Sequence, residues 1–278
     1  MPEVRLSHGT IHYSDTGSGP VVVLVHGLLV NGTLWSRVGP LLDRDFRVVI
    51  PDLPLGSHRE AMKSAADLSP AGLARLVADM LFELDLTDVT LVGNDTGGAI
   101  CQLVAADHPD RLARLVLTNC DAYENFLPPA FRPLQLLPRI PGATWLASRS
   151  LPSPVARWAF GLLAATPIPR SVHDGWMAPI RGNRLVRRDT GKVLRGITSR
   201  ETMRAAAALR SFDRPVLLAW GLRDPFFRPR YARRLAGDIP GARLEWIEGA
   251  KTFVPLDAPD RLAELVADFA RRPVTRAG

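Results

Sequence analysis

Short apolar runs alternate with amphipathic helical patterns along the first part of the chain, and this alternation restricts the possible folds more than any other feature. Residues 21–25, 46–50, 89–92 and 112–117 are rich in Val, Ile and Leu. Such continuous runs are typical of strands that are buried on both faces. Between them, residues 70–84 carry apolar side chains at helical spacing, with Pro70 suited to a first turn. The alternation predicts an α/β fold with a mostly parallel sheet and helices on both faces.

The alternation is preceded by a predicted hairpin, residues 4–7 and 11–15, and it stops after Thr118. Residues 123–212 are rich in Pro and Arg, lack a buried-strand run, and look helical near residues 154–164 and 201–209. A strand pattern then returns at residues 215–220 and again at 243–247, with helical patterns at 229–236 and 259–271. We therefore expect one core domain, residues 1–122 and 213–278, interrupted by a helical cap insertion, residues 123–212.

The net charge is unevenly distributed. The chain of 278 residues is 46% hydrophobic and 23% charged, an ordinary globular balance, with a formal charge of +7. Residues 130–214 contain 14 Arg and one Lys against four acids, a net +11, so the rest of the chain carries −4. The arginines are dispersed and no recognition motif accompanies them, so we expect no nucleic-acid partner. They either attract an anionic substrate to the cap or form a solvated surface.

Several other classes of protein are disfavoured by the sequence. Two cysteines, Cys101 and Cys120, cannot build a disulfide framework or a zinc site alone. The N-terminal residues are polar, and the apolar run at 21–30 is far shorter than the ~20 residues of a membrane span. No phosphate-binding glycine loop or metal-ligand cluster is evident. We expect a cytoplasmic protein without a cofactor, a metal or a membrane partner, and the oligomeric state stays open.

The turn at Gly93-Asn94-Asp95-Thr96-Gly97 carries the strongest chemical signal. A buried strand leads through this turn into a helix. The residues two places before and after Asp95 must be small, because larger side chains at Gly93 and Gly97 would collide with neighbouring atoms. This arrangement holds the central residue in a strained conformation at the carboxyl edge of the sheet. The following helix adds free backbone N–H groups. Asp95 is therefore predicted to be an exposed, rigidly held carboxylate, the alternative being an ordinary helix cap.

With these motifs, the chain resembles the α/β-hydrolase superfamily over nearly its whole length. The matching motifs are His26-Gly27, Asp52-Leu53-Pro54, the nucleophile elbow at Asp95, Gly221-Leu222-Arg223-Asp224, and the segment from Phe253 to Pro259. An Asp at the elbow resembles the haloalkane dehalogenase and epoxide hydrolase branch. The resemblance implies that a carboxylate attacks carbon to form an alkyl ester, which water then hydrolyses.

The resemblance also implies roles for individual positions. Asp95 matches the nucleophile, and Asp224 matches the acid that orients the catalytic histidine. The backbone N–H groups of Leu28 and Thr96 match the oxyanion hole. The histidine position is occupied by Thr252, and no histidine follows His173. A threonine hydroxyl is not a base at neutral pH, so the second half-reaction lacks its usual catalyst.

The missing histidine leaves three hypotheses about function. The first is a hydrolase that uses Asp95 on an epoxide, alkyl halide or related small molecule, with a base that is non-standard or missing. His58 is the candidate alternative base, although it could instead have a purely structural role. The second is a non-hydrolytic lyase or cyclase in which Asp95 is an acid or base. The third is a catalytically impaired protein that only binds ligands.

Two further departures concern the leaving group. Dehalogenases of this branch commonly have Trp directly after the nucleophile and often Asn after His-Gly, whereas this chain has Thr96 and Leu28. Epoxide hydrolases use two cap tyrosines, but the insertion contains only Tyr123, at its border. Three insertion tryptophans either line an apolar pocket or form a small core of the insertion: Trp145, Trp158 and Trp176.

Overall fold

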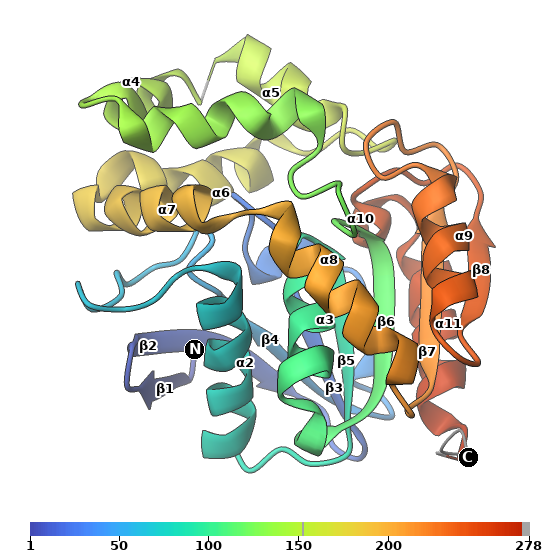
Figure 1. Ribbon diagram of the computed structural model, residues 1–278. Helices are drawn as coiled ribbons and strands as arrows, with labels where there is room; N and C mark the ends of the chain where they lie inside the picture. Colours follow the sequence, from blue (N-terminus) through green and yellow to red (C-terminus); the bar gives the residue numbers. More distant parts are fainter. Residues whose placement is uncertain (152, 274–278) are drawn as a thin grey trace.

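The computed structural model describes residues 1–151 and 153–273. Residue 152 of the predicted insertion and residues 274–278 of the predicted core lie outside the described residues. An eight-stranded sheet with the order β1-β2-β4-β3-β5-β6-β7-β8 forms the centre of the molecule (Figure 1). Its strands are β1 (Glu3–Leu6), β2 (Gly9–Thr16), β3 (Val21–Val25), β4 (Arg47–Pro51), β5 (Val89–Asp95), β6 (Leu112–Cys120), β7 (Val216–Gly221) and β8 (Arg243–Ile247).

The pairing of the strands confirms the predicted α/β sheet. β1 and β2 form an antiparallel hairpin, and β2 pairs antiparallel with β4. All later pairs are parallel, so the carboxyl ends of β3 to β8 meet at one edge of the sheet. All residues of β6 and β7 are buried, which explains why their sequences do not alternate between apolar and polar residues.

The chain forms the helices that the periodicity predicted, together with others that it did not predict. Their bounds are α1 (Gly39–Leu42), α2 (Pro70–Glu83), α3 (Thr96–Asp107), α4 (Ala143–Ser150), α5 (Pro154–Gly161), α6 (Arg170–Gly182), α7 (Arg184–Gly196), α8 (Ser199–Ala208), α9 (Pro229–Asp238), α10 (Val254–Asp257) and α11 (Pro259–Arg271). Residues 32–42 form no long helix but a 3-10 turn, η1 (Gly32–Trp35), followed by the short α1. Pro40 allows a helix to begin there but not to continue through it.

The sheet is covered on both faces by separate apolar layers. One layer packs α2, α3, α8 and α9 against the sheet, and the other packs α1, α10 and α11 on the opposite side. On α2 the buried side chains recur at helical spacing, among them Leu73, Leu76, Val77 and Met80. Ser69 starts this helix by accepting a hydrogen bond from the N–H of Gly72 at 3.2 Å, as an N-cap residue should.

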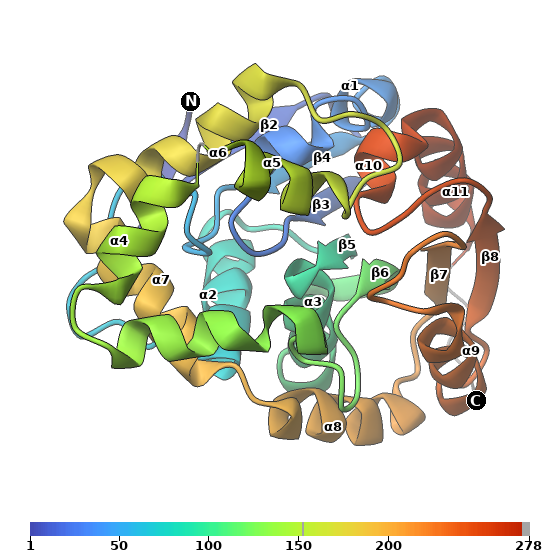
Figure 2. The same cartoon turned by 90° about the horizontal axis from the view of Figure 1, so that it is seen from above.

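The chain between β6 and β7 contains the helices α4 to α8 and the 3-10 helix η3 (Pro129–Arg139). α4 to α7 lie above the carboxyl edge of the sheet, whereas α8 descends along α3 (Figures 1 and 2). Trp176 of α6 joins this segment to the core, because its indole Nε1 donates to Thr33 Oγ1 at 2.7 Å and its ring packs on Phe253. The exact limits predicted for the insertion, residues 123–212, stay a prediction.

Candidate active site

Asp95 lies at the point where β5 passes into α3. Its backbone has φ +55° and ψ −133°, a combination that a residue with a side chain rarely adopts. Its side chain makes no capping hydrogen bond to α3. The ordinary role of an Asp as a helix N-cap is therefore absent.

Two glycines permit the close approach of backbone and carboxylate at this turn. A Cβ atom on Gly27 would lie 2.0 Å from Asp95 Oδ2, and one on Gly97 would lie 2.4 Å from the carbonyl oxygen of His26. Neither distance is possible for real atoms. The loop after β3 and the start of α3 are thus packed directly against the Asp95 carboxylate, as the sequence pattern around the elbow predicted.

The carboxylate contacts the backbone donors expected of an oxyanion hole. The N–H of Leu28 donates to Asp95 Oδ2 at 3.1 Å. Burial raises the pKa of Asp95 to about 7, although hydrogen bonds from the N–H groups of Thr96 and Leu28 favour the charged form, and the nearby Asp224 charge raises this pKa further. An acid with this pKa exchanges its proton near neutral pH, which is the range that suits acid–base or nucleophilic chemistry.

Asp224 and Thr252 form a second buried group beside the elbow. Thr252 Oγ1 donates to Asp224 Oδ2 at 2.8 Å, so the threonine makes the contact to this acid that the resemblance assigns to the catalytic histidine. The N–H groups of Phe226 and Phe227 donate to Asp224 Oδ1 at 2.7 and 3.1 Å. Both oxygens of Asp224 are therefore satisfied without a histidine.

Two asparagines that the sequence reasoning missed hold this group in place. Asn119 donates to Asp224 Oδ2 at 2.9 Å and accepts from the N–H of Gly221 at 2.6 Å. Asn94 donates to the carbonyl oxygen of Thr252 at 2.7 Å. Both lie in the last residues of buried strands, and a polar residue at that position in an apolar run was the signal that could have identified them.

Asp121 is a third buried carboxyl group at the same edge of the sheet. Its Oδ2 accepts a hydrogen bond from Thr96 Oγ1 at 3.2 Å, and its Oδ1 has no hydrogen-bond partner within the described residues. Burial raises the pKa of Asp121 well above its ordinary value, and the charges of Asp95 and Asp224 act in the same direction. The Thr96 hydroxyl therefore faces a buried carboxyl group that holds its proton more tightly than an exposed aspartic acid does.

An apolar cavity of about 310 Å³ opens above Asp95. Among the described residues, only Asp95 and Thr96 line it with polar side chains, and the rest of the wall comes from η3, α5, the loops beside them and the loop after β3. The other lining residues are Leu28, Leu29, Leu127, Pro128, Ala130, Phe131, Pro133, Leu134, Leu151, Ala156, Ala159, Phe160 and Leu163. Its size and apolar walls fit a small uncharged organic molecule.

The cap side chains that we considered for substrate contact lie elsewhere. No arginine lines the cavity within residues 1–151 and 153–273, so its walls give no support to an anionic substrate. Trp145 and Trp158 are exposed at the surface, and Trp176 belongs to the core under the cap, so none of the three lines this cavity. The hydroxyl of Tyr123 donates to Asp238 at 3.0 Å and is likewise not part of the cavity wall.

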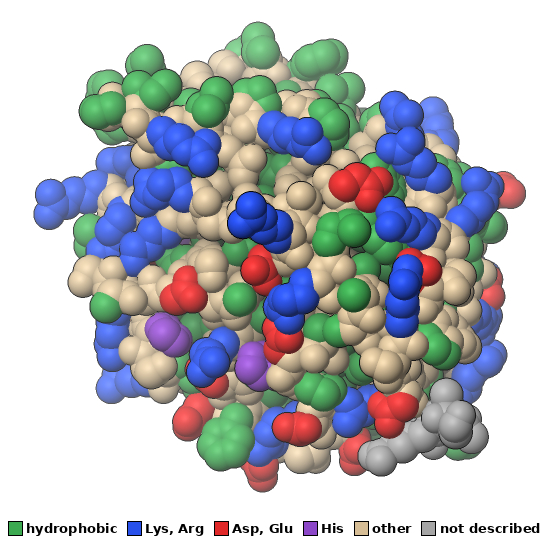
Figure 3. All heavy atoms as spheres, viewed as in Figure 1, with side chains coloured by type: hydrophobic (Ala, Val, Ile, Leu, Met, Phe, Trp, Pro, Cys, Tyr) green, Lys and Arg blue, Asp and Glu red, His purple; other side chains and the backbone are tan. Residues whose placement is uncertain are grey.

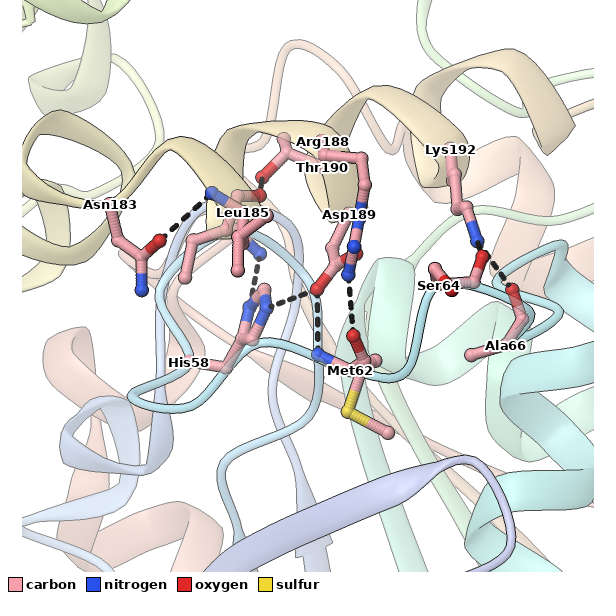
Figure 4. A network of polar contacts seen from close by, with 12 residues as sticks. His58, Met62, Ser64, Ala66, Asn183, Leu185, Arg188, Asp189, Thr190 and Lys192 are labelled. Atoms are coloured by element: carbon pink, nitrogen blue, oxygen red, sulfur yellow. Dashed lines mark hydrogen bonds and ion pairs between the residues drawn. The ribbon is translucent and has the colours of Figure 1, made fainter.

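His58 lies in a polar network that joins the core to α7 (Figure 4). Its Nδ1 accepts from the N–H of Gly56 and its Nε2 faces Asp189 Oδ2, each at 3.4 Å. Asp189 also accepts from the N–H of Met62 at 2.8 Å and from Arg188 Nε at 2.9 Å. Within the described residues no histidine forms a hydrogen bond or an ion pair with Asp95. The role of His58 as an alternative base stays a prediction without a contact to support it.

His26 organises the backbone of two neighbouring loops. Its Nδ1 faces the carbonyl oxygen of Gly27 at 2.8 Å, and its Nε2 accepts from the N–H of Leu53 at 2.9 Å. It thereby ties the loop after β3 to the loop after β4.

In the described part of the chain, no group of three or more His, Cys, Asp or Glu side chains could hold a metal ion.

Comparisons with known proteins agree with this geometry. Residues 20–259 match the sequence model of the family described as alpha/beta hydrolase fold. Haloalkane dehalogenase 2 of Mycobacterium tuberculosis is 28% identical over 277 residues, which cover 94% of this chain and 92% of that protein. An uncharacterized protein of the same organism is 28% identical over 282 residues, covering 96% of this chain and 80% of its own length.

Solved structures show the same fold. An ancestral haloalkane dehalogenase superposes with a TM-score of 0.80 at 22% identity, over 97% of this chain and 98% of that one. The match of the family model spans most of the sequence, and the sheet order and elbow geometry are consistent with it. The chain therefore belongs to the alpha/beta hydrolase fold family.

Proposed function

We propose that the protein uses Asp95 as a nucleophile on an electrophilic carbon of a small, neutral, apolar molecule, and that it forms an alkyl ester on that residue. The observation that carries the proposal is the strained Asp95 backbone, which holds the carboxylate against the Leu28 N–H at 3.1 Å and at the base of an apolar cavity. A haloalkane dehalogenase among the relatives supports carbon electrophiles as the substrate class.

In the proposed step, Asp95 Oδ1 attacks the substrate carbon while Oδ2 stays hydrogen-bonded to the backbone of Leu28. A carbon–oxygen bond forms to the aspartate and the bond from carbon to the leaving atom breaks. A halide leaves as an anion and needs no proton. An epoxide oxygen leaves as an alkoxide, which must gain a hydrogen bond and then a proton.

Thr96 and Asp121 supply that proton in our proposal. At rest the Thr96 hydroxyl donates to Asp121 Oδ2 at 3.2 Å. When the alkoxide forms, this hydroxyl turns to it and gives up its proton while the Asp121 carboxyl proton passes to Thr96 Oγ1, so Asp121 ends as a carboxylate. Thr96 lines the cavity next to Asp95, which supports a role for this residue near the leaving atom. This pair would replace the tryptophan and tyrosine donors that the chain lacks.

The ester formed on Asp95 is expected to be long-lived. Its hydrolysis needs a base beside a water molecule, a contribution of typically 10²–10⁴-fold in rate. Thr252 is a donor to Asp224 rather than a base, and no histidine contacts Asp95 within the described residues. Formation of the ester is thus expected to be faster than its release.

Intact mass spectrometry tests the proposal. The protein is incubated with phenethyl iodide or styrene oxide, and any adduct is located by peptide mapping. We expect one added alkyl group on Asp95 in the native protein and none in Asp95→Asn, which keeps the shape of the side chain. An adduct on another residue, or turnover of either probe by Asp95→Asn, would refute the proposed nucleophile.

A second function is favoured by one specific observation, the pKa of Asp95 near 7, which also suits a general acid or base in a non-hydrolytic reaction. In that case the same probes would leave Asp95 unmodified. A product isomeric with its substrate, lost in Asp95→Asn, would favour this reading. Saturable binding of the probes with neither adduct nor product would favour a protein that only binds ligands.

A further inference from the structure

The outer surface of the cap exposes an unusual concentration of large apolar side chains. Of the 11 large hydrophobic residues exposed in the described chain, six lie between residues 136 and 158. We call these six residues the cap crest: Leu136, Ile140, Trp145, Leu146, Val155 and Trp158. Figure 3 shows hydrophobic side chains gathered along the top of the molecule, over α4 and α5. Apolar surface concentrated in this way is typical of an interaction site rather than of ordinary exposed residues.

The charge around the crest is predominantly positive, although Arg170 pairs with the nearby Asp174 at 3.4 Å. Residues 125–173 contain five arginines, at 132, 139, 149, 157 and 170, and no Asp or Glu. Arg149 lies over the ring of Trp145, with its Cζ atom 5.3 Å from the ring centroid. In Figure 3, Lys and Arg side chains form a band directly below the apolar top. A membrane has charged headgroups at its surface and apolar acyl chains beneath them. If the exposed apolar side chains enter the acyl region, the arginines below them on the protein lie at the level of anionic headgroups.

The crest is also next to the cavity. On α5, Val155 and Trp158 are exposed, whereas Ala156, Ala159 and Phe160 line the cavity above Asp95. One helix of eight residues therefore separates the outer apolar surface from the inner one. An apolar molecule dissolved at a membrane surface would have a short path to Asp95 without crossing bulk water.

A second copy of the chain fits the crest less well. In a symmetric dimer the same patch meets itself, so the arginines of one copy would face those of the other, with no acid of residues 125–173 to pair with them. Anionic headgroups, in contrast, carry the opposite charge and can pair with these arginines. The charge therefore favours a lipid surface over self-association.

We propose that the cap crest binds the surface of a membrane containing anionic phospholipid, with the crest side chains inserted at the headgroup boundary. From the sequence we expected no membrane partner, because no apolar run is long enough to span a bilayer. Peripheral binding needs no such run, and no helix in the described part of the chain is long and apolar enough to cross a membrane. The binding does not depend on the chemistry proposed for Asp95.

Vesicle co-sedimentation tests the proposal, with large vesicles of phosphatidylcholine alone or mixed with phosphatidylglycerol. We expect binding to the mixed vesicles that weakens with salt, and a blue shift of tryptophan emission that brominated lipid quenches. Trp158→Ser should weaken binding about tenfold, because the side chain loses its apolar burial. Phe82→Ser is the matched control, since Phe82 is as exposed as Trp158, 66% each, but lies on α2.

The charge contribution is tested in the same assay. Arg139→Gln and Arg149→Gln should each weaken binding about fivefold on mixed vesicles and hardly at all on phosphatidylcholine. Asp95→Asn should bind as the native protein does, which separates this proposal from the proposed function. Absence of binding to mixed vesicles, or equal losses in Trp158→Ser and Phe82→Ser, would overturn the proposal. A native dimer that Trp158→Ser converts to a monomer would assign the crest to a second copy instead.

Discussion

Replacing Asp95 by Asn should stabilise the fold, and the gain should depend on pH in a defined way. Burial raises the pKa of Asp95 from its ordinary value of 3.8 to about 7 in the folded protein. Each unit of difference between the folded and unfolded pKa corresponds to about 1.4 kcal/mol, so ionising this group costs the fold at most about 4 kcal/mol. Asp95 also borders the cavity, which lowers the cost of its charge. We therefore expect Asp95→Asn to raise the free energy of unfolding by about 2 to 4 kcal/mol.

The sign follows from the direction of the shift. The folded state binds the Asp95 proton more tightly than the unfolded state, so the native protein loses stability relative to Asp95→Asn as the pH rises. The difference should be small below pH 3.8, grow between pH 3.8 and about 7, and stay constant above that. Asn keeps the carbonyl oxygen that accepts from the Leu28 N–H, so this contact is conserved in the variant.

Urea denaturation of both proteins at matched pH values measures this difference, with equal slopes required so that the free energies are comparable. Thr252→Val is a useful control, since it changes a neighbouring buried side chain without changing the charge of Asp95. A difference between the native protein and Asp95→Asn that does not change with pH would refute the buried, shifted carboxylate. An Asn variant that is less stable at every pH would do the same.

Three other changes have expected outcomes. Thr96→Val should slow alkylation by styrene oxide about 100-fold and alkylation by phenethyl iodide only slightly, whereas Thr96→Ser should keep both rates. Stopped-flow mixing with mass detection measures these rates, and equal losses with both probes would exclude Thr96 as the proton donor. Asp189→Leu should cost about 3 to 5 kcal/mol in urea denaturation, because it leaves the Arg188 charge and the Met62 N–H without their acceptor. Ala159→Trp should reduce binding of both probes by filling the cavity, while methyl iodide, being smaller, should still modify Asp95.

The sheet and the elbow were predictable because both depend on local sequence. Continuous Val, Ile and Leu runs require burial on two faces, and the glycines around Asp95 are needed by any turn that brings backbone this close to a carboxylate. The contacts of Leu28 and Thr252 then follow from the order of the strands, since the loops after parallel strands meet at one edge.

Features that depend on how distant segments pack were not predictable. Asp121 could not be identified as a site residue from the sequence, because the contact that matters is with Thr96 on another element. Thr96 Oγ1 lies 3.2 Å from Asp121 Oδ2 inside the core. The sequence left open whether the arginines of the insertion attract a substrate. Among the described residues none lines the cavity, and Arg188 pairs with the buried Asp189 where α7 meets the core. Trp158 and Phe160 are two residues apart on α5, and helical geometry sends them to opposite sides of the cap.

The number of iodide ions released per protein molecule tests the central claim, that Asp95 forms an ester which this site cannot readily release. With excess phenethyl iodide, the native protein should release about one equivalent of iodide and then stop or continue only slowly, with the alkyl group on Asp95. Thr252→His, which places an imidazole beside Asp224, should release many equivalents. Steady release of many equivalents by the native protein, without an adduct, would contradict the account.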